Sequence, residues 1–173
     1  MIISDHYKDQ LMQFHDKNPS WGSEGGKYAN EILGFTGHDC SVLDYGCGKG
    51  KLKVVLDKDM PEKGIECFEF DPGIPGKDEC PVDEVDYVVS RDVLEHIEPD
   101  CIEHVLWHIS TLASKGVWFQ IHTKKAGAIL PDGRNAHLIQ EGLEWWSDML
   151  EEYFPGHTIS WDRGTWLIVT WRK

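Results

Sequence analysis

The sequence lacks any long hydrophobic stretch. None of its apolar runs approaches the roughly 18 to 20 residues that a membrane-spanning helix requires. Its first ten residues, MIISDHYKDQ, also lack the basic segment followed by an apolar segment that marks a secretory signal. These two absences disfavour a membrane or secreted protein, and we expect a cytoplasmic location.

The cysteines are scattered and lack the paired spacing that zinc ribbons use. No two cysteines of the chain form a CxxC pair, and the five are Cys40, Cys47, Cys67, Cys80 and Cys101. Scattered cysteines of this kind are expected to be free thiols in a reducing compartment, which disfavours a zinc ribbon.

Positive charge is also scarce. The chain has 17 Lys and Arg residues against 30 Asp and Glu, for a net charge of -13. Such a field repels phosphate backbones, so a long nucleic acid is a disfavoured partner. A small molecule, a sugar or a protein partner is compatible with this charge.

The 173 residues are predicted to form one domain over 1–173, because no linker, repeat or low-complexity tract divides them. Residues 1–35 are predicted to form a polar helical cap. Within this cap we expect a helix over 27–33, with Ser20 or Ser23 as its N-terminal cap and Gly34 as its end.

Beyond the cap, short apolar runs alternate with amphipathic segments. Strands are predicted at 41–45, 64–70, 85–90 and 116–122, and helices at 51–56, 101–113 and 141–154. Two further runs, 157–161 and 165–171, bracket Asp162-Arg163-Gly164, which is typical of a β-hairpin. This order predicts an α/β fold with a Rossmann-like, doubly wound, mostly parallel sheet and a C-terminal antiparallel hairpin. In the last helix, Trp145 and Trp146 are about 100° apart, so at least one is expected in the core.

A glycine-rich loop, Gly46-Cys47-Gly48-Lys49-Gly50, follows the first predicted strand. Glycines there allow backbone to approach a ligand where a side chain would collide, although a plain strand-to-helix turn also favours glycine. The N–H groups at the start of the next helix suit an anion or a carboxylate-bearing cofactor. Asp71 ends the second strand, where an acid can accept the hydroxyls of a ribose. The GxGxG spacing, with Asp44 two residues before it, disfavours a nicotinamide oxidoreductase.

Three motifs in this order, VLDYGCGKG, FDP and VDYVVSRDVLEHI, resemble those of the class I S-adenosylmethionine-dependent methyltransferases. The resemblance spans roughly residues 41–123. It implies S-adenosylmethionine as the cofactor and methyl transfer to a hydroxyl, in preference to an amine, of a small molecule or glycan. It also implies that Asp71 holds the cofactor's ribose. The loop residues implied to bind the cofactor are Asp44, Gly46, Cys47, Gly48 and Gly50.

The chain departs from the pattern of this family between its second and third motifs. Only 14 residues, 72–85, separate Asp71 from Asp86, too few for the family's usual helix and strand. The third, edge strand is therefore expected to be missing or reduced to a few residues around 80–82. Because the family draws adenine contacts from this region, Val82 and Arg91 become candidates for that wall. The shortening also supports an alternative function, a non-catalytic S-adenosylmethionine-binding regulatory or scaffold protein.

A candidate metal site lies at the end of the third motif. A helix beginning over 92–97 would place Asp92, Glu95 and His96 at i, i+3 and i+4 on one face, and His137 could supply a fourth ligand. This set suits Mg²⁺ or Mn²⁺, which would lower the pKa of an acceptor hydroxyl. It resembles the ubiquinone-biosynthesis O-methyltransferases and, more distantly, the small-RNA 2′-O-methyltransferases. The same Leu-Glu-His-Ile turn also occurs in methyltransferases without a metal.

Residues 123–140 are predicted to form an acceptor-side loop. It leaves the carboxyl end of a strand, where open α/β sheets bind ligands, and loops of this length in compact domains are usually functional. His122 and His137 flank or lie in it and are candidate general bases, because neutral imidazole accepts a proton near pH 7. Each histidine also has a purely structural interpretation.

Overall fold

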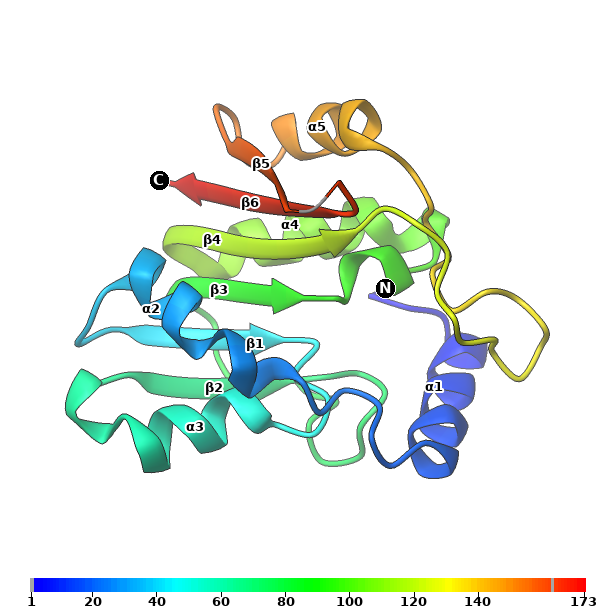
Figure 1. Cartoon of the computed structure of the whole chain (residues 1–173), viewed down its shortest axis with the longest axis horizontal. Coiled ribbons are helices and arrows are strands. Elements are labelled where there is room, and N and C mark those ends of the chain that lie inside the picture. The colour runs from blue at the N-terminus through cyan, green and yellow to red at the C-terminus, as the bar shows by residue number, and fades with distance from the viewer. Residues whose placement is uncertain (1, 163) are drawn as a thin grey trace.

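The computed structural model describes residues 2–162 and 164–173, and Figure 1 shows one sheet with helices on both faces. The α-helices are α1 (Asp5–Lys17), α2 (Ala29–Thr36), α3 (Lys51–Asp59), α4 (Ile102–Leu112) and α5 (Leu143–Glu151). Short 3-10 turns are η1 (Gly25–Tyr28), η2 (Pro61–Lys63), η3 (Leu94–His96) and η4 (Pro99–Cys101). The strands are β1 (Ser41–Tyr45), β2 (Glu66–Phe70), β3 (Val85–Arg91), β4 (Ala113–His122), β5 (Thr158–Asp162) and β6 (Trp166–Arg172).

The six strands form a sheet in the order β2-β1-β3-β4-β6-β5. The first four in this order are mutually parallel, whereas β6 runs antiparallel to both β4 and β5. The predicted mostly parallel sheet with a C-terminal hairpin is therefore confirmed. Of the predicted hairpin turn, Arg163 lies outside the described residues.

Two apolar cores, one on each face of the sheet, explain why helices cover both sides. Successive strand residues point to opposite faces. In β1, Val42 packs with the buried residues of α2 and α3, and Leu43 packs with those of α4 and α5. Trp146 is fully buried in the second of these cores, while Trp145 is only partly covered.

The third, edge strand of the family pattern is missing. Residues 71–84, all described, form turns and bends with no strand, so β2 is the edge of the sheet. The short predicted strand around 80–82 is not formed. The chain is too short there to leave the sheet, make a helix and return.

The helix predicted over 27–33 differs from the one observed. The observed helix, α2, runs through Gly34 to Thr36. Gly37, with φ of 79°, ends it. Left-handed backbone at Gly37 stops the helical path, whereas Gly34 stays helical in open space. Neither Ser20 nor Ser23 caps this helix, because no side chain bonds its N-terminus. The Ser23 hydroxyl donates instead to the carbonyl of Ser20.

All five cysteines are free thiols, as the sequence predicted, and Cys40, Cys47 and Cys67 are buried. Within the described ranges, no helix has the length and apolar character needed to cross a membrane.

The carboxyl ends of β1, β3 and β4 point toward α1 and the 123–140 loop, which is yellow in Figure 1. Ligands of open α/β sheets bind at this end. A ligand site is therefore expected in the space between these strand ends and α1.

Candidate active site

A cavity of about 350 Å³ lies between the carboxyl ends of the strands and α1. Most of the predicted cofactor residues line it, namely Asp44, Gly46, Cys47, Gly48, Asp71 and Arg91. Gly50 stands outside this lining and instead begins α3 with a left-handed φ of 70°. Three separate strand ends therefore contribute to one cavity, as the motif order predicted.

The glycines of the loop are required by contacts within the chain itself. Gly46 and Gly48 have φ of 81° and 51°, a region that favours glycine. A Cβ on Gly48 would lie 2.6 Å from the carbonyl oxygen of Gly22, and one on Gly46 would collide with Val93. The loop thus packs backbone to backbone against the segment after α1, and Lys49 N–H donates to Gly22 O at 2.9 Å.

Asp71 and Asp44 place two buried carboxylates at the cavity. Asp71 accepts the N–H of Gly48 at 2.8 Å and that of Gly73 at 2.9 Å, one with each oxygen. Burial raises the pKa of Asp44 to about 7, and the charges of Glu69 and Asp71 add to this rise. Asp44 is therefore a proton-exchanging group near neutral pH, held where a cationic ligand would favour its ionised form.

The predicted metal set converges, but not through the predicted helix. Asp92 has a left-handed φ of 58°, which breaks the helical path, and only the 3-10 turn η3 follows. A different geometry brings the ligands together, because the chain after β3 folds back under the 123–140 loop. Ligand atoms of Asp92, Glu95, His96 and His137 all lie within 4.8 Å of one another.

Backbone groups hold one side-chain polar atom in each of three members of this cluster. Glu95 is fully buried; its Oε1 accepts the His122 N–H at 2.7 Å, while its Oε2 has no partner. His96 Nδ1–H donates to the Ala136 carbonyl at 2.7 Å, and His137 Nδ1–H donates to the Lys124 carbonyl. In both histidines the Nε2 atom is thus left with its lone pair.

Burial shifts the pKa values of three side chains in the cluster. Burial, reinforced by the charge of Asp92, raises the pKa of Glu95 well above its usual range. Burial lowers the pKa of His96 to about 4 and also lowers that of His137. The two imidazoles are therefore neutral near pH 7, the form that ligates metals.

The two candidate general bases occupy different positions. His137 is buried within the cluster, whereas the ring of His122 packs 4.8 Å from that of His137 and 4.5 Å from Trp166. His122 Nδ1 lies 3.0 Å from the Lys124 carbonyl oxygen and 3.1 Å from its N–H nitrogen. Neither histidine is among the described residues that line the cavity, so their role as general bases stays a prediction.

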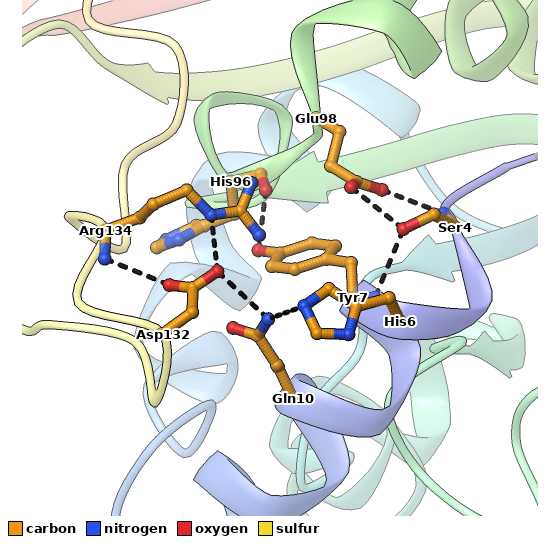
Figure 2. Close-up of polar contacts among 8 residues, drawn as sticks. All are labelled: Ser4, His6, Tyr7, Gln10, His96, Glu98, Asp132 and Arg134. Carbon is orange, nitrogen blue, oxygen red and sulfur yellow. Dashed lines mark hydrogen bonds and ion pairs between the residues drawn. The ribbon is translucent and has the colours of Figure 1, made fainter.

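Helix α1 closes the site through polar contacts that Figure 2 shows. The Tyr7 hydroxyl donates to the His96 carbonyl at 2.7 Å, and Gln10 donates to Asp132 in the 123–140 loop at 2.9 Å. Ser4 bonds Glu98 through its hydroxyl and its N–H. Contacts on both sides of the cluster therefore hold α1 across the cavity.

Helix α1, which the sequence predicts only as part of a cap, also contributes side chains to the site. Tyr7, Phe14 and His15 of α1, and Trp21 after it, line the cavity. The Trp21 ring lies edge-on to Phe14 at 4.8 Å and to His96 at 5.4 Å. The available signal was a stripe at helical spacing, 7-11-14, in an otherwise polar helix.

Comparisons with known proteins identify the family of the chain. Residues 5–165 match the family model described as a methyltransferase domain, and the chain belongs to that family. The resemblance to the class I S-adenosylmethionine-dependent methyltransferases is thereby confirmed, whereas the resemblance to the ubiquinone-biosynthesis O-methyltransferases stays a prediction. No curated protein sequence is significantly similar to the chain.

Solved methyltransferases share the fold at low sequence identity. The 1,6-didemethyltoxoflavin-N1-methyltransferase of Burkholderia thailandensis, with its substrate and S-adenosylhomocysteine bound, is 18% identical with a TM-score of 0.67. That match covers 100% of this chain and 92% of the other. Human N-acetylserotonin methyltransferase in complex with SAM is 16% identical with a TM-score of 0.62, covering 96% and 56%. The mitomycin 7-O-methyltransferase is 16% identical with a TM-score of 0.63, covering 95% and 60%.

Proposed function

We propose that this methyltransferase uses S-adenosylmethionine as its methyl donor and acts on a hydroxyl of a small molecule, with a glycan as the second acceptor class. The donor is supported by the cavity at the GxGxG loop and by neighbours of the same fold that bind SAM or S-adenosylhomocysteine. The neighbours include methyltransferases for nitrogen and for oxygen, so the preference for oxygen rests on the cluster beside the cavity.

The observation that carries the hydroxyl assignment is the unpartnered Oε2 of Glu95. An ionised carboxylate buried in this way is costly, which is why the pKa of Glu95 is raised, and a cation beside Oε2 would stabilise the ionised form. Two neutral imidazole nitrogens and the carboxylate of Asp92 complete a donor set suited to Mn²⁺ or Mg²⁺. When bound, such an ion would lower the pKa of an acceptor hydroxyl that contacts it.

The residues of the chain then have separate roles. Asp44 and the loop around Gly48 hold the donor, and Asp71 holds its ribose. Arg91, whose Nε donates to Gln120 at 2.8 Å and whose guanidinium lies 4.0 Å from the Tyr28 ring, forms a wall near the adenine. If His137 holds the ion, His122 is the residue left to accept the acceptor's proton.

The first test is calorimetric titration of the chain with S-adenosylhomocysteine in EDTA, in Mg²⁺ and in Mn²⁺. We expect binding in the micromolar range, about -8 kcal/mol, and heat from ion binding in the absence of cofactor. No binding in any buffer would overturn the donor assignment. Binding of the cofactor without any ion binding would overturn the cluster's role alone.

The acceptor class needs a second test. Matched phenol- and aniline-bearing small molecules, and oligosaccharides, are incubated with S-adenosylmethionine, and methylated products are measured by mass spectrometry. The proposal expects methyl groups on hydroxyls, with the yield reduced by EDTA. Methylation of amines that is indifferent to EDTA would contradict it.

A non-catalytic cofactor-binding protein is the competing proposal, and the missing edge strand favours it because the usual adenine contacts come from that region. That reading expects S-adenosylhomocysteine binding with no methylated product from any acceptor. Conversion of S-adenosylmethionine to S-adenosylhomocysteine that requires an added acceptor would exclude this proposal.

A further inference from the structure

His15 on α1 is a buried histidine whose binding potential the chain itself does not satisfy. Its side chain lines the cavity, and the residue is only 7% exposed. Its Nδ1 atom is buried and has no hydrogen-bond partner among the described residues. A buried polar atom in this state costs free energy, and such atoms in native proteins usually meet a ligand, water or ion.

The position of His15 identifies the part of the cavity it serves. A Cβ added to Gly22 would lie 3.0 Å from Gly48 Cα and 3.4 Å from His15 Cε1, so His15 borders the loop. Burial lowers the pKa of His15, while the neighbouring charge of Asp71 opposes this effect. The imidazole is therefore neutral near pH 7 and offers one donor and one acceptor.

Asp71, beside it, has capacity for further hydrogen bonds. Each of its two carboxylate oxygens accepts one backbone N–H, from Gly48 and from Gly73, and each can accept a second donor. A ligand group between Asp71 and His15 must donate to the carboxylate and also pair with the imidazole. A hydroxyl does both, whereas the cofactor's own carboxylate cannot donate and would be repelled by Asp71.

We propose that His15 is a further cofactor-binding residue, which hydrogen-bonds a ribose hydroxyl of S-adenosylmethionine together with Asp71. This inference rests on the proposed function, because it takes S-adenosylmethionine as the occupant of the cavity. It gives α1 a direct part in binding, in addition to covering the site. Cofactor binding then pairs the buried Nδ1 and fastens α1 to the glycine loop.

The test compares ligands that differ by one hydroxyl. S-adenosylhomocysteine and its 2′-deoxy and 3′-deoxy analogues are titrated calorimetrically into the native chain, His15→Phe and His15→Gln. His104→Phe, on the exposed side of α4, is the matched control. Melting temperatures establish that each variant is folded.

We expect His15→Phe to lose about fivefold to tenfold in affinity for S-adenosylhomocysteine, the size of one hydrogen bond. It should lose nothing toward the analogue that lacks the partner hydroxyl. Glutamine, which can donate and accept, should restore most of the affinity, and His104→Phe should bind like the native chain.

Two outcomes would overturn the assignment while leaving the proposed function intact. One is equal loss in His15→Phe for all three ligands, which would make His15 a packing residue. The other is unchanged affinity for S-adenosylhomocysteine. If the native chain binds none of the three, the proposed function itself fails, and the role of His15 falls with it.

Discussion

Gly48 of the glycine-rich loop and Gly22 of the segment after α1 lie backbone against backbone, with no room for a side chain on Gly48. A Cβ there would lie 2.6 Å from the carbonyl oxygen of Gly22 and 2.8 Å from its Cα. This contact joins the N-terminal segment to the loop at the end of β1. Gly48 therefore lines the cavity and also holds the N-terminal segment against it.

Gly48→Ala should therefore destabilise the chain and weaken cofactor binding together. A side chain at its left-handed φ of 51° costs about 1–3 kcal/mol, and the collision with Gly22 adds to this. Gly34→Ala is the control, since Gly34 is helical with open space around it and alanine should stabilise by about 0.5–1 kcal/mol. Urea unfolding and titration with S-adenosylhomocysteine measure both effects. A Gly48→Ala variant as stable as the native chain would contradict the observed contact.

Glu95→Gln should abolish stabilisation by a divalent ion. The glutamine keeps an oxygen for the His122 N–H but cannot offer a carboxylate to the ion. In the native chain, Mn²⁺ at 100 times its Kd should add about 2.7 kcal/mol to the free energy of unfolding. The variant should gain little, while its stability in EDTA stays close to that of the native chain, because burial raises the pKa of Glu95 and keeps it neutral, as glutamine is.

Thermal melts with Mn²⁺ and with EDTA measure this difference. Glu103→Gln, an exposed residue of α4, is the matched control and should respond to Mn²⁺ like the native chain. Equal Mn²⁺ stabilisation in Glu95→Gln would remove Glu95 from the ligand set.

Asp44→Asn should change how stability depends on pH. The pKa of Asp44 is raised to about 7 in the folded chain, above its usual value of 3.8, so the folded state binds the proton more tightly. That contribution to stability is complete below pH 4 and is lost as the pH rises to 7. As the pH rises, the free energy of unfolding of the variant should therefore increase relative to that of the native chain by a few kcal/mol, on the order of 1.4 kcal/mol per pKa unit of the shift.

Urea unfolding at pH 5, 6, 7 and 8 measures the difference, which should grow with pH and level off above 7. The same variant should bind S-adenosylmethionine more weakly, because the cationic sulfonium and amine favour ionised Asp44. A difference that stays constant with pH would show that Asp44 has an ordinary pKa.

Trp146→Ala should cost about 3–5 kcal/mol, the usual price of removing a large aromatic side chain from a core. Trp146 is 0% exposed between α5 and the sheet, whereas its neighbour Trp145 is only partly covered. Trp145→Ala should therefore cost clearly less in the same urea unfolding measurement. Equal losses would mean that the two side chains share the core.

The sequence by itself determined the order of strands and helices, the two-faced sheet and the glycine-rich loop. These features follow from local patterns: alternating apolar residues, helical spacing and glycines at a strand end. Even the missing edge strand was readable, because 14 residues cannot make a helix and return to the sheet. The helix expected over 92–97 failed because a non-glycine residue, Asp92, adopts a left-handed φ that its local sequence does not signal.

Only the tertiary structure decided how distant segments complete the site. His137 reaches Glu95 because the 123–140 loop folds back, with the Ile139 N–H donating to the Glu95 carbonyl at 2.9 Å. His15 reaches the cavity because Gly22 and Gly48 can touch. Contacts between residues far apart in the chain depend on how whole layers pack, and the periodicity of a single segment carries no record of them.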